Sequence, residues 1–408
     1  MNESESIEST VLRTREAGRL LRSVDHERVM HALMTASEQI ANPLSTLGHK
    51  ARALLPAQTG LSPANIERAL SDSLSALREE SLRKALSAFE RAFDGHMTAR
   101  SSLAGMILAG NVFTASLRPI AWSLLLRVPV LVKPSSEDEG LSTLFVDAIA
   151  EADPEIGHAL GFVRFGRADP ALLAHFAESC DVLHVWGSDE TIAEVRTRLR
   201  ATTSLVPHGH GLGAIYVPRS ALTERVATEI ALDTSLYDQR GCLSPHFVFV
   251  EKSARTSAID FACMLGEQAF AEMERAIPRG PLPLEVGASQ MQWRGLGAVR
   301  GELFEGERWA VSFEGRAPFR VSPGYRNLAV YEIDSLDELG RVLAPLGIHL
   351  KALGVAGDPD LRRAVASALP TGLAPRISRP GEMQRPGLLA SADGERPWSG
   401  FVRTIDLE

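Results

Sequence analysis

The stretch VPVLVKPSS (128–136) indicates a short buried strand that ends in a lysine, a proline and two serines. Helical and strand-like patterns alternate after it: helix 141–152, strand 161–165, helix 169–179, strand 181–186 and helix 189–200. Strands that alternate with helices of about ten to fifteen residues are typical of βαβ units. The sequence therefore predicts an α/β fold with a largely parallel sheet.

The same alternation resumes after the glycine-rich turn HGHGLG (208–213). It consists of strand 214–218, helix 220–236, strand 246–251 and helix 256–276. From GPLPLEVG (280–287), which is rich in proline and glycine, to about residue 330 we expect shorter strands. Towards the N-terminus, residues 8–92 have apolar side chains at helical spacing, and prolines divide them into several helices.

The length of the chain predicts more than one lobe. Its 408 residues exceed the roughly 250–300 at which a single hydrophobic core usually splits. We expect the N-terminal helices and a first lobe over 1–207, a second lobe over 208–370, and a C-terminal segment over 371–408. The end of that segment alternates apolar and polar residues. It is therefore expected to add a strand to the first lobe or to a neighbouring subunit.

The composition excludes several classes of protein. With 43 basic and 51 acidic residues, the net charge of −8 gives no general attraction for nucleic acid or anionic membranes. The most apolar stretch (120–132) is interrupted by Arg127 and Pro129 and is shorter than the ~20 residues of a membrane helix. The acidic start is unlike a signal peptide, and three scattered cysteines form neither a disulfide framework nor a zinc site. We expect a soluble, cytoplasmic protein.

One cysteine stands in a sequence that suits catalysis. In YDQRGCLSPH (237–246), Cys242 follows Gly241 and precedes an apolar strand. A thiolate accepts acyl groups and the resulting thioester accepts hydride, so one cysteine supports acyl transfer followed by reduction. The alternative is a buried core cysteine, the usual state of a lone cysteine. Cys180 and Cys263 lie in apolar helical stretches, and we assign both to the core.

Two strand ends are candidates for nucleotide binding. Lys133 leaves the carboxyl end of a parallel strand, where open α/β sheets bind nucleotides. The Gly187-Ser188 turn joins a strand to a helix, so its amides can face a pyrophosphate. The alternatives are a solvated lysine and an ordinary helix cap at Ser188. A GxGxxG motif is absent.

Three histidines near these motifs have less clear roles. His208 and His210 could bind a metal only with a third ligand, and the sequence indicates none, so no metal site is predicted. His246 follows Cys242 by four residues, which is roughly 13 Å in extended chain, so a role as its base requires a bend.

Taken together and in order, these motifs resemble the aldehyde dehydrogenase superfamily. The motifs are Asn111, Lys133-Pro134-Ser135-Ser136, Gly187-Ser188, the glycine turn at 209–213, Gln239 and Cys242. The resemblance implies an aldehyde dehydrogenase-like fold of two αβα lobes with a small C-terminal oligomerisation segment, and a cofactor bound without GxGxxG. It also implies Cys242 as the nucleophile and Asn111 as an oxyanion-binding residue. Lys133 and Ser136 would hold the adenosine ribose, and Gly187-Ser188 the pyrophosphate.

Residues 100–408 are similar to one branch of that superfamily, the LuxC-type acyl-CoA reductases of bacterial bioluminescence. The Gln-x-x-Cys-x-Ser-Pro run (239–245) and the tail carry this similarity. It implies NAD(P)H-dependent reduction of an acyl thioester, either acyl-CoA or an acyl carrier, to an aldehyde. It also implies a homo-oligomer, with an acyl-activating synthetase as a candidate partner.

The chain departs from the superfamily at three places. The glutamate that activates the deacylating water in oxidising members falls at Pro207 or His208. Oxidising members often carry a carboxylate where Ser136 falls; a serine leaves room for a 2′-phosphate and favours NADPH, with NADH as the alternative. The Glu-x-Phe-Gly-Pro segment is not recognisable, and RVSPGY (320–325) is its candidate counterpart. Two other functions stay open: an acyl-phosphate reductase like glutamyl-phosphate reductase, and a non-catalytic scaffold for an acyl-activating partner.

Overall fold

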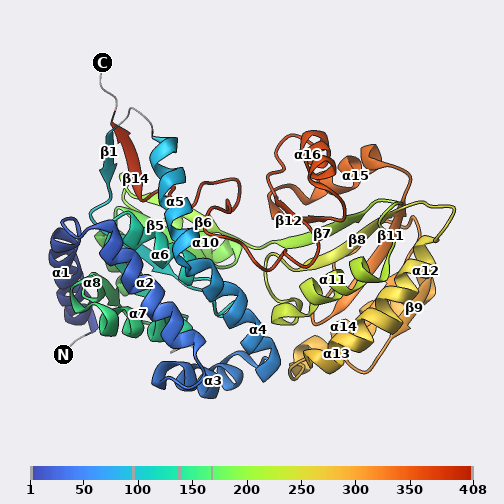
Figure 1. The fold of residues 1–408 in the computed structure, drawn as a ribbon, viewed down its shortest axis with the longest axis horizontal. Coiled ribbons are helices and arrows are strands. Elements are labelled where there is room, and N and C mark those ends of the chain that lie inside the picture. The colour runs from blue at the N-terminus through green and yellow to red at the C-terminus, as the bar shows by residue number, and fades with distance from the viewer. Residues whose placement is uncertain (1–2, 94–96, 136–139, 167–168, 406–408) are drawn as a thin grey trace.

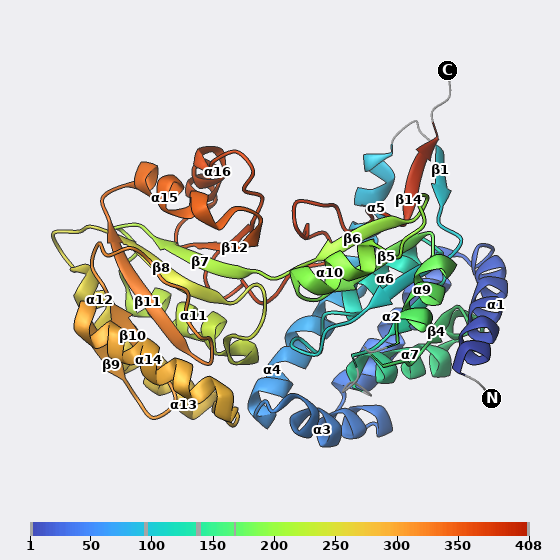
Figure 2. The same cartoon turned by 180° about the vertical axis from the view of Figure 1, so that it is seen from behind.

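The computed structural model describes residues 3–93, 97–135, 140–166 and 169–405. Two sheets, each with helices around it, lie side by side, and the chain crosses between them after β6 (Figures 1 and 2). Ser136 lies outside the described residues.

The first sheet is wholly parallel, in the order β4-β3-β2-β5-β6. Its strands are β2 (Ala104–Ile107), β3 (Val130–Lys133), β4 (Leu160–Phe162), β5 (Val182–Trp186) and β6 (Ser204–His208). Its helices are α6 (Leu117–Leu125), α7 (Leu141–Ala152), α8 (Pro154–Gly157), α9 (Pro170–Ser179) and α10 (Asp189–Arg196). The predicted βαβ alternation is confirmed, and β2 is buried along its whole length, as in sheets covered on both faces.

The N-terminal region is helical, as expected. It comprises α1 (Glu3–Leu21), α2 (His26–Ala41), α3 (Thr46–Thr59), α4 (Pro63–Leu74), a 3-10 turn (Ser75–Leu77) and α5 (Glu79–Ala92). Ser45 and Ser62 cap α3 and α4 by accepting backbone N–H groups, and Pro63 occupies the first turn of α4. The buried face of α2 packs against α7, so these helices cover the first sheet.

The second sheet has the order β13-β12-β7-β8-β11-β10-β9 and is parallel except for the edge strand β9. Its strands are β7 (Leu212–Val217), β8 (Pro245–Glu251), β9 (Glu302–Glu305), β10 (Ala310–Phe313), β11 (Asn327–Ile333), β12 (Leu350–Val355) and β13 (Arg376–Ser378). Its helices are α11 (Glu224–Ser235), α12 (Ala258–Cys263), α13 (Ala271–Ala276), α14 (Leu284–Arg300), α15 (Leu336–Leu343) and α16 (Pro359–Ala368). Shorter pieces are η2 (Leu236–Gln239), η3 (Met264–Phe270) and η4 (Ala344–His349).

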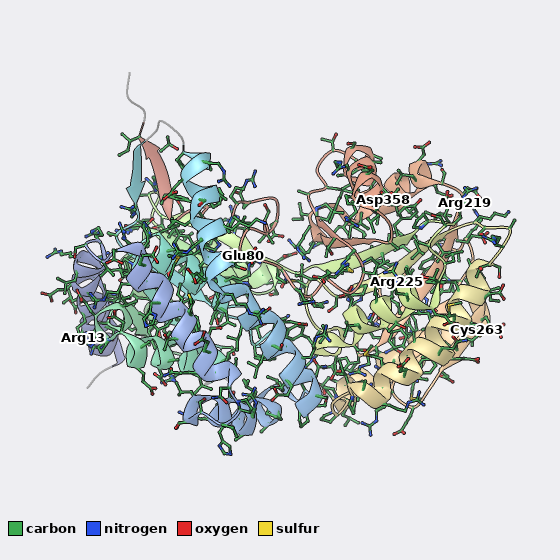
Figure 3. All side chains as sticks on the ribbon, viewed as in Figure 1. Arg13, Glu80, Arg219, Arg225, Cys263 and Asp358 are labelled. Carbon is green, nitrogen blue, oxygen red and sulfur yellow. The ribbon has the colours of Figure 1, made fainter. Side chains whose placement is uncertain are left out.

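Two sequence-based assignments in this region are wrong. Short strands were expected from residue 280, but a 17-residue helix, α14, begins at Leu284 and is followed by β9, β10 and β11. Cys263 is half-buried at the end of α12 rather than in the core, and Figure 3 places it on the outer side of its lobe.

The C-terminal segment contacts both sheets. β13 extends the second sheet, whereas β14 (Val402–Ile405) pairs antiparallel with β1 (Met97–Arg100), and this pair projects from the first lobe (Figure 1). Phe401, just before β14, is fully buried and stacks on His184 at 4.7 Å between ring centroids. Within the described ranges, no helix is long and apolar enough to cross a membrane.

Candidate active site

A cavity of about 860 Å³ lies where the two sheets meet. Asn111, Gly187, Ser188 and Cys242 all line it, so the fold brings four of the six predicted site residues together. Lys133 is not among its described lining residues; its Nζ lies 5.4 Å from the centre of the Phe165 ring instead. Ser136, the sixth, is not described.

The loop that carries Cys242 is clamped by Gln239, the first residue of the Gln-x-x-Cys-x-Ser-Pro run. The Gln239 Nε2 donates to the carbonyls of Pro245 and Asn327, both at 2.8 Å, and its Oε1 accepts the N–H of Asn327 at 2.9 Å. Gln239 is buried, so these bonds are shielded from water. The motif thereby fixes the start and the end of the Cys242 loop against β8 and β11.

A hydrogen bond places Asn111 beside this loop. The Asn111 Nδ2 donates to the carbonyl of Arg240 at 3.1 Å. Gly241 allows the close approach, because a Cβ there would lie 3.3 Å from the side chain of Val112. A side-chain amide and the N–H of Cys242 are the donor types that stabilise an oxyanion. The arrangement is thus suited to acyl transfer.

The electrostatic surroundings hold Cys242 as a thiol at rest. Its side chain opens into the cavity, yet protein surrounds it closely, and burial raises the pKa of Cys242 to about 11. The negative charge of Asp393 adds to this rise in pKa, and Lys351 opposes it. Lys351 and Asp393 form an ion pair at the wall of the cavity. No sequence motif pointed to Lys351, and Asp393 lies in the tail that resembles the LuxC-type reductases without a role having been assigned to it.

His208 is stacked on a neighbouring ring and has a polar neighbour near each ring nitrogen. Its ring stacks on Trp186 with centroids 4.1 Å apart, and its Nε2 lies 3.3 Å from the Nδ1 of His184. Its Nδ1 lies 3.7 Å from the carboxylate of Asp393. Burial lowers the pKa of His208, although Asp393 opposes that effect. The imidazole of His208, one of the two candidate counterparts of the oxidising members' glutamate, is thus already in contact with other side chains.

His246 is a poor base in this site. Its Nδ1–H donates to the carbonyl of Ser322 at 3.2 Å, and burial lowers the pKa of His246 to about 4. Ser322 belongs to the 320–325 segment, and residues 321–325 line the same cavity. The candidate counterpart of the Glu-x-Phe-Gly-Pro segment thus lies at the site.

The turn between β5 and α10 caps a helix and also faces the cavity, so the two alternatives considered for it do not exclude each other. The Ser188 Oγ accepts the N–H of Thr191 at 3.3 Å and caps α10, while Gly187 and Ser188 both face the cavity. A Cβ at Gly187 would lie 3.1 Å from Thr191. The turn lies at the carboxyl end of a parallel strand, where nucleotides bind in open sheets.

Among the described residues, no group of three or more His, Cys, Asp or Glu side chains is arranged to hold a metal ion.

Comparisons with known proteins show the family and the fold of the chain. The family model of acyl-CoA reductase (LuxC) matches residues 4–404. A long-chain acyl-protein thioester reductase of Photobacterium leiognathi is 23% identical over 239 residues, which cover 57% of this chain and 49% of that protein. The match therefore spans about half the length of this relative.

Solved structures with the same fold are aldehyde dehydrogenases. An indole-3-acetaldehyde dehydrogenase of P. syringae, solved with NAD+, has a TM-score of 0.76 at 12% identity, covering 98% of this chain and 88% of that one. A putative aldehyde dehydrogenase of Burkholderia cenocepacia has a TM-score of 0.74 at 17% identity, covering 98% and 91%. These likenesses confirm the expected aldehyde dehydrogenase-like fold.

Proposed function

Because the chain belongs to the acyl-CoA reductase (LuxC) family, we propose that it reduces an acyl thioester to an aldehyde through an acyl-Cys242 intermediate. The observation that supports this function best is the cavity shared by Cys242 and Asn111, with the Cys242 loop clamped by Gln239. A clamped nucleophile beside an amide donor is the arrangement that acyl transfer needs.

The first step is acyl transfer. The thiol of Cys242 loses its proton, and the thiolate attacks the carbonyl carbon of the thioester. A tetrahedral oxyanion forms, stabilised by the Asn111 amide and the Cys242 N–H. As the oxyanion collapses, the bond to the donor sulfur breaks, and the released thiolate takes up a proton. The acyl group is then bound to Cys242 as a thioester.

The second step is reduction. A nicotinamide cofactor, when bound, supplies the hydride that the acyl carbon accepts. The same donors hold the second oxyanion, whose collapse releases the aldehyde and the Cys242 thiolate. The Gly187-Ser188 turn suits a pyrophosphate because it opens into the cavity at a strand end. Lys133 and Ser136 are assigned to the adenosine ribose by resemblance alone.

Finer assignments belong to the same proposal. The serine at 136 favours NADPH over NADH, because a carboxylate there would repel a 2′-phosphate. The acyl donor is acyl-CoA or an acyl carrier, and an acyl-activating synthetase is a candidate partner. We propose a homo-oligomer, and a division into residues 1–207, 208–370 and 371–408.

Intact-protein mass spectrometry tests this function. The protein is mixed with a panel of acyl-CoAs, or with acyl phosphates, in the absence of any nicotinamide cofactor. We expect a mass increase of one acyl group, retained in Cys180→Ala and Cys263→Ser and lost in Cys242→Ser. An acyl adduct that persists in Cys242→Ser, or no adduct with any donor, contradicts the proposal. Adducts from acyl phosphates alone would identify the other reductase class.

A further inference from the structure

Three successive residues before Cys242 have a left-handed backbone. Tyr237, Asp238 and Gln239 have φ values of 55°, 50° and 60°. None is glycine, and such angles are unfavourable for L-residues because the Cβ crowds the following carbonyl. A turn of this kind persists where the surrounding structure over-determines it. The groups that hold this turn therefore also set the position of Cys242.

Asn65, on α4, holds the first part of the turn. Its Oδ1 accepts the N–H of Tyr237 at 3.0 Å, and its Nδ2 donates to the carbonyl of Ser235 at 3.0 Å. The same Nδ2 lies 3.4 Å from the carboxylate of Asp238. Asn65 is 0% exposed, so water cannot replace these bonds if the side chain is removed. One amide therefore holds the backbone at the start of the turn, just before it and at its first residue.

The second lobe holds the opposite side of the turn. The Asp238 Oδ1 accepts from the Nε and Nη2 of Arg326 at 3.1 and 2.7 Å, and its Oδ2 accepts the N–H of Gly280 at 3.0 Å. Both charged side chains are buried. A buried charge that keeps its partners is fixed in place, because losing a partner is costly. The turn is thus held between α4 and the second lobe.

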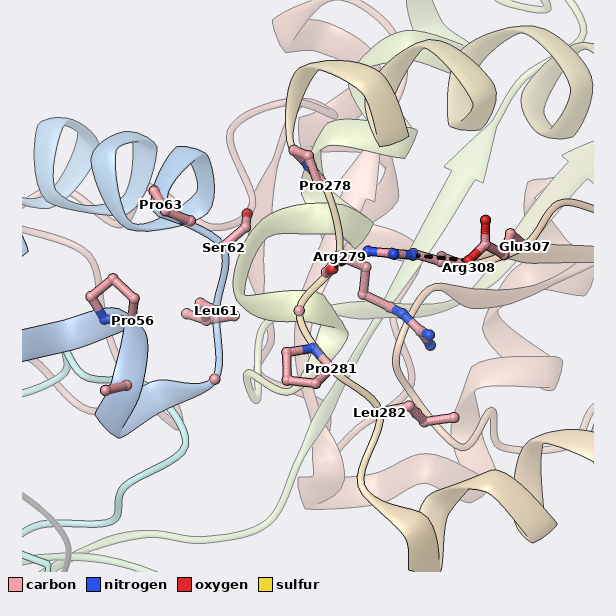
Figure 4. Close-up of a pocket in the computed structure, with 13 residues that line it drawn as sticks. Pro56, Leu61, Ser62, Pro63, Pro278, Arg279, Pro281, Leu282, Glu307 and Arg308 are labelled. Atoms are coloured by element: carbon pink, nitrogen blue, oxygen red, sulfur yellow. Dashed lines mark hydrogen bonds and ion pairs between the residues drawn. The ribbon is translucent and has the colours of Figure 1, made fainter.

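A further hydrogen bond links the N-terminal helices to the residue that follows the turn. The Arg240 Nη2 donates to the carbonyl of Thr59 at 2.9 Å, where α3 ends. Figure 4 shows how the connection between α3 and α4 faces the 278–282 loop across a second cavity. The two segments approach so closely that a Cβ on Gly280 would lie 1.8 Å from the carbonyl oxygen of Gly60.

We propose that Asn65 is a positioning residue for Cys242, an inference that rests on the proposed function. The N-terminal helices, through Asn65, hold the left-handed turn so that the thiol and Asn111 stay aligned. Asn111 donates to the carbonyl of Arg240, which follows the turn directly. A shift of the turn therefore displaces the nucleophile and one contact of the oxyanion site together.

The test compares Asn65→Ala with Ser62→Ala. Ser62 caps the same helix, and Ser62→Ala removes its bond to the Asn65 N–H (3.3 Å) while leaving the Asn65 side-chain bonds intact. Two rates are measured well below the unfolding temperature: acylation of Cys242 by an acyl-CoA without nicotinamide cofactor, and alkylation of Cys242 by iodoacetamide. Acylation needs the oxyanion contacts, whereas alkylation needs the thiolate alone.

We expect Asn65→Ala to slow acylation about 10- to 100-fold, as small displacements of reacting groups do, and to change alkylation by less than about threefold. The KM for the acyl-CoA should stay within about twofold, and Ser62→Ala should match the wild type. If Asn65→Ala does not fold, Arg240→Gln removes the half-buried tie to Thr59 and should slow acylation about threefold to tenfold.

Equal acylation rates in Asn65→Ala and Ser62→Ala, or in Arg240→Gln and the wild type, would overturn the positioning role. A wild-type protein that forms no acyl-Cys242 would overturn the proposed function itself, and the inference with it.

Discussion

In the proposed mechanism Cys242 must ionise in order to attack, yet its surroundings favour the neutral thiol. Burial and then the charge of Asp393 raise the pKa of Cys242 to about 11, and Lys351 opposes them. Because the thiolate is the reactive form, the charges of Lys351 and Asp393 adjust, on top of the effect of burial, how much thiolate exists at a given pH.

Substitutions of the two partners should change the reactivity of Cys242 in opposite directions. Asp393→Asn removes a negative charge, lowers the thiol pKa and should raise the iodoacetamide alkylation rate at pH 8 by about threefold to tenfold. Lys351→Met should lower that rate by a similar factor, since one pKa unit is a tenfold change in thiolate. Below its pKa, the wild-type rate should rise about tenfold per pH unit. Peptide mass spectrometry of Cys242 measures all three.

Glu395→Gln is the matched control for charge removal. Glu395 also lines the cavity, but its carboxylate bonds the hydroxyl of Ser399 rather than Lys351. In this variant the alkylation rate of Cys242 should stay within about twofold of the wild-type rate, because solvent ions screen the charge of an exposed carboxylate. A wild-type rate that levels off below pH 9, or Asp393 and Lys351 variants that shift in the same direction, would contradict the prediction.

Motif residues were predictable, and their partners across the cavity were not. Gly187, Ser188 and Cys242 each stand in a local sequence whose residue types suit a known chemistry, the family resemblance added Asn111, and the fold gathers all four. Lys351 in β12 has no local signature, and Asp393 belongs to the tail stretch of the family likeness, which assigned it no role. Their pairing depends on tertiary structure, as does the stacking of His208 on Trp186.

Helix α14 shows how packing can override local preference. Gly287, Gly295 and Gly297 lie within it, and glycines at this density are typical of breaks. The helix nevertheless buries Trp293, and the guanidinium carbon of Arg320 lies 4.3 Å from the Trp293 ring centroid. Helix propensity is a weak preference that such contacts outweigh.

Two of these glycines should respond differently to alanine. A Cβ on Gly295 would meet nothing within 4 Å, whereas one on Gly297 would lie 3.0 Å from the Cβ of Ser312. We expect Gly295→Ala to raise the free energy of unfolding by about 0.5–1 kcal/mol, through helix propensity. For Gly297→Ala, the free energy of unfolding should stay unchanged or fall by about 1 kcal/mol. Urea denaturation measures both, and equal gains would show that α14 can move away from β10.

The tail is expected to stabilise the first lobe. Phe401 is 0% exposed and stacks on His184, and Trp398 packs on Trp122 with centroids 5.4 Å apart. Phe401→Ala should therefore lower the free energy of unfolding by about 3–5 kcal/mol, as for other buried aromatic residues. Ile405→Ala, at a residue 37% exposed in β14, should cost about 0.5 kcal/mol or less. Equal stability of both variants would mean that the tail docks without supporting the lobe.

The candidate active site lies where both sheets and the tail meet. The first sheet provides Gly187, Ser188 and His208, the second provides Lys351, and the tail provides Asp393. The α/β class and most elements followed from periodicity, because that signal is local. Which strand ends face each other across the cavity did not follow, because it depends on the packing of segments far apart in sequence.

The side chains around the cavity should also affect how long the proposed acyl-Cys242 intermediate survives in water. An acyl-enzyme that awaits hydride is productive when water attacks it slowly, and hydrolysis needs a base near the attacking water. Pro207 has no side-chain acceptor. His208 stacks on Trp186, lies 3.3 Å from His184 and faces Asp393, and burial lowers its pKa. These contacts hold the imidazole in the wall of the cavity.

We therefore expect acyl-Cys242 to decay slowly in buffer and quickly when CoA is added, with little oxidation of aldehyde to free acid. A missing general base is worth roughly 10²–10⁴-fold, so the contrast between water and thiol should be clear. The acyl-enzyme is isolated by gel filtration, and its decay is followed by intact mass with and without CoA, in wild type and His208→Ala. If the contacts of His208 keep it from acting as a base, the acyl-enzyme of His208→Ala decays no more slowly than that of the wild type. Rapid loss to free acid without thiol contradicts the expectation. Slower loss in His208→Ala would assign the missing carboxylate's role to this imidazole.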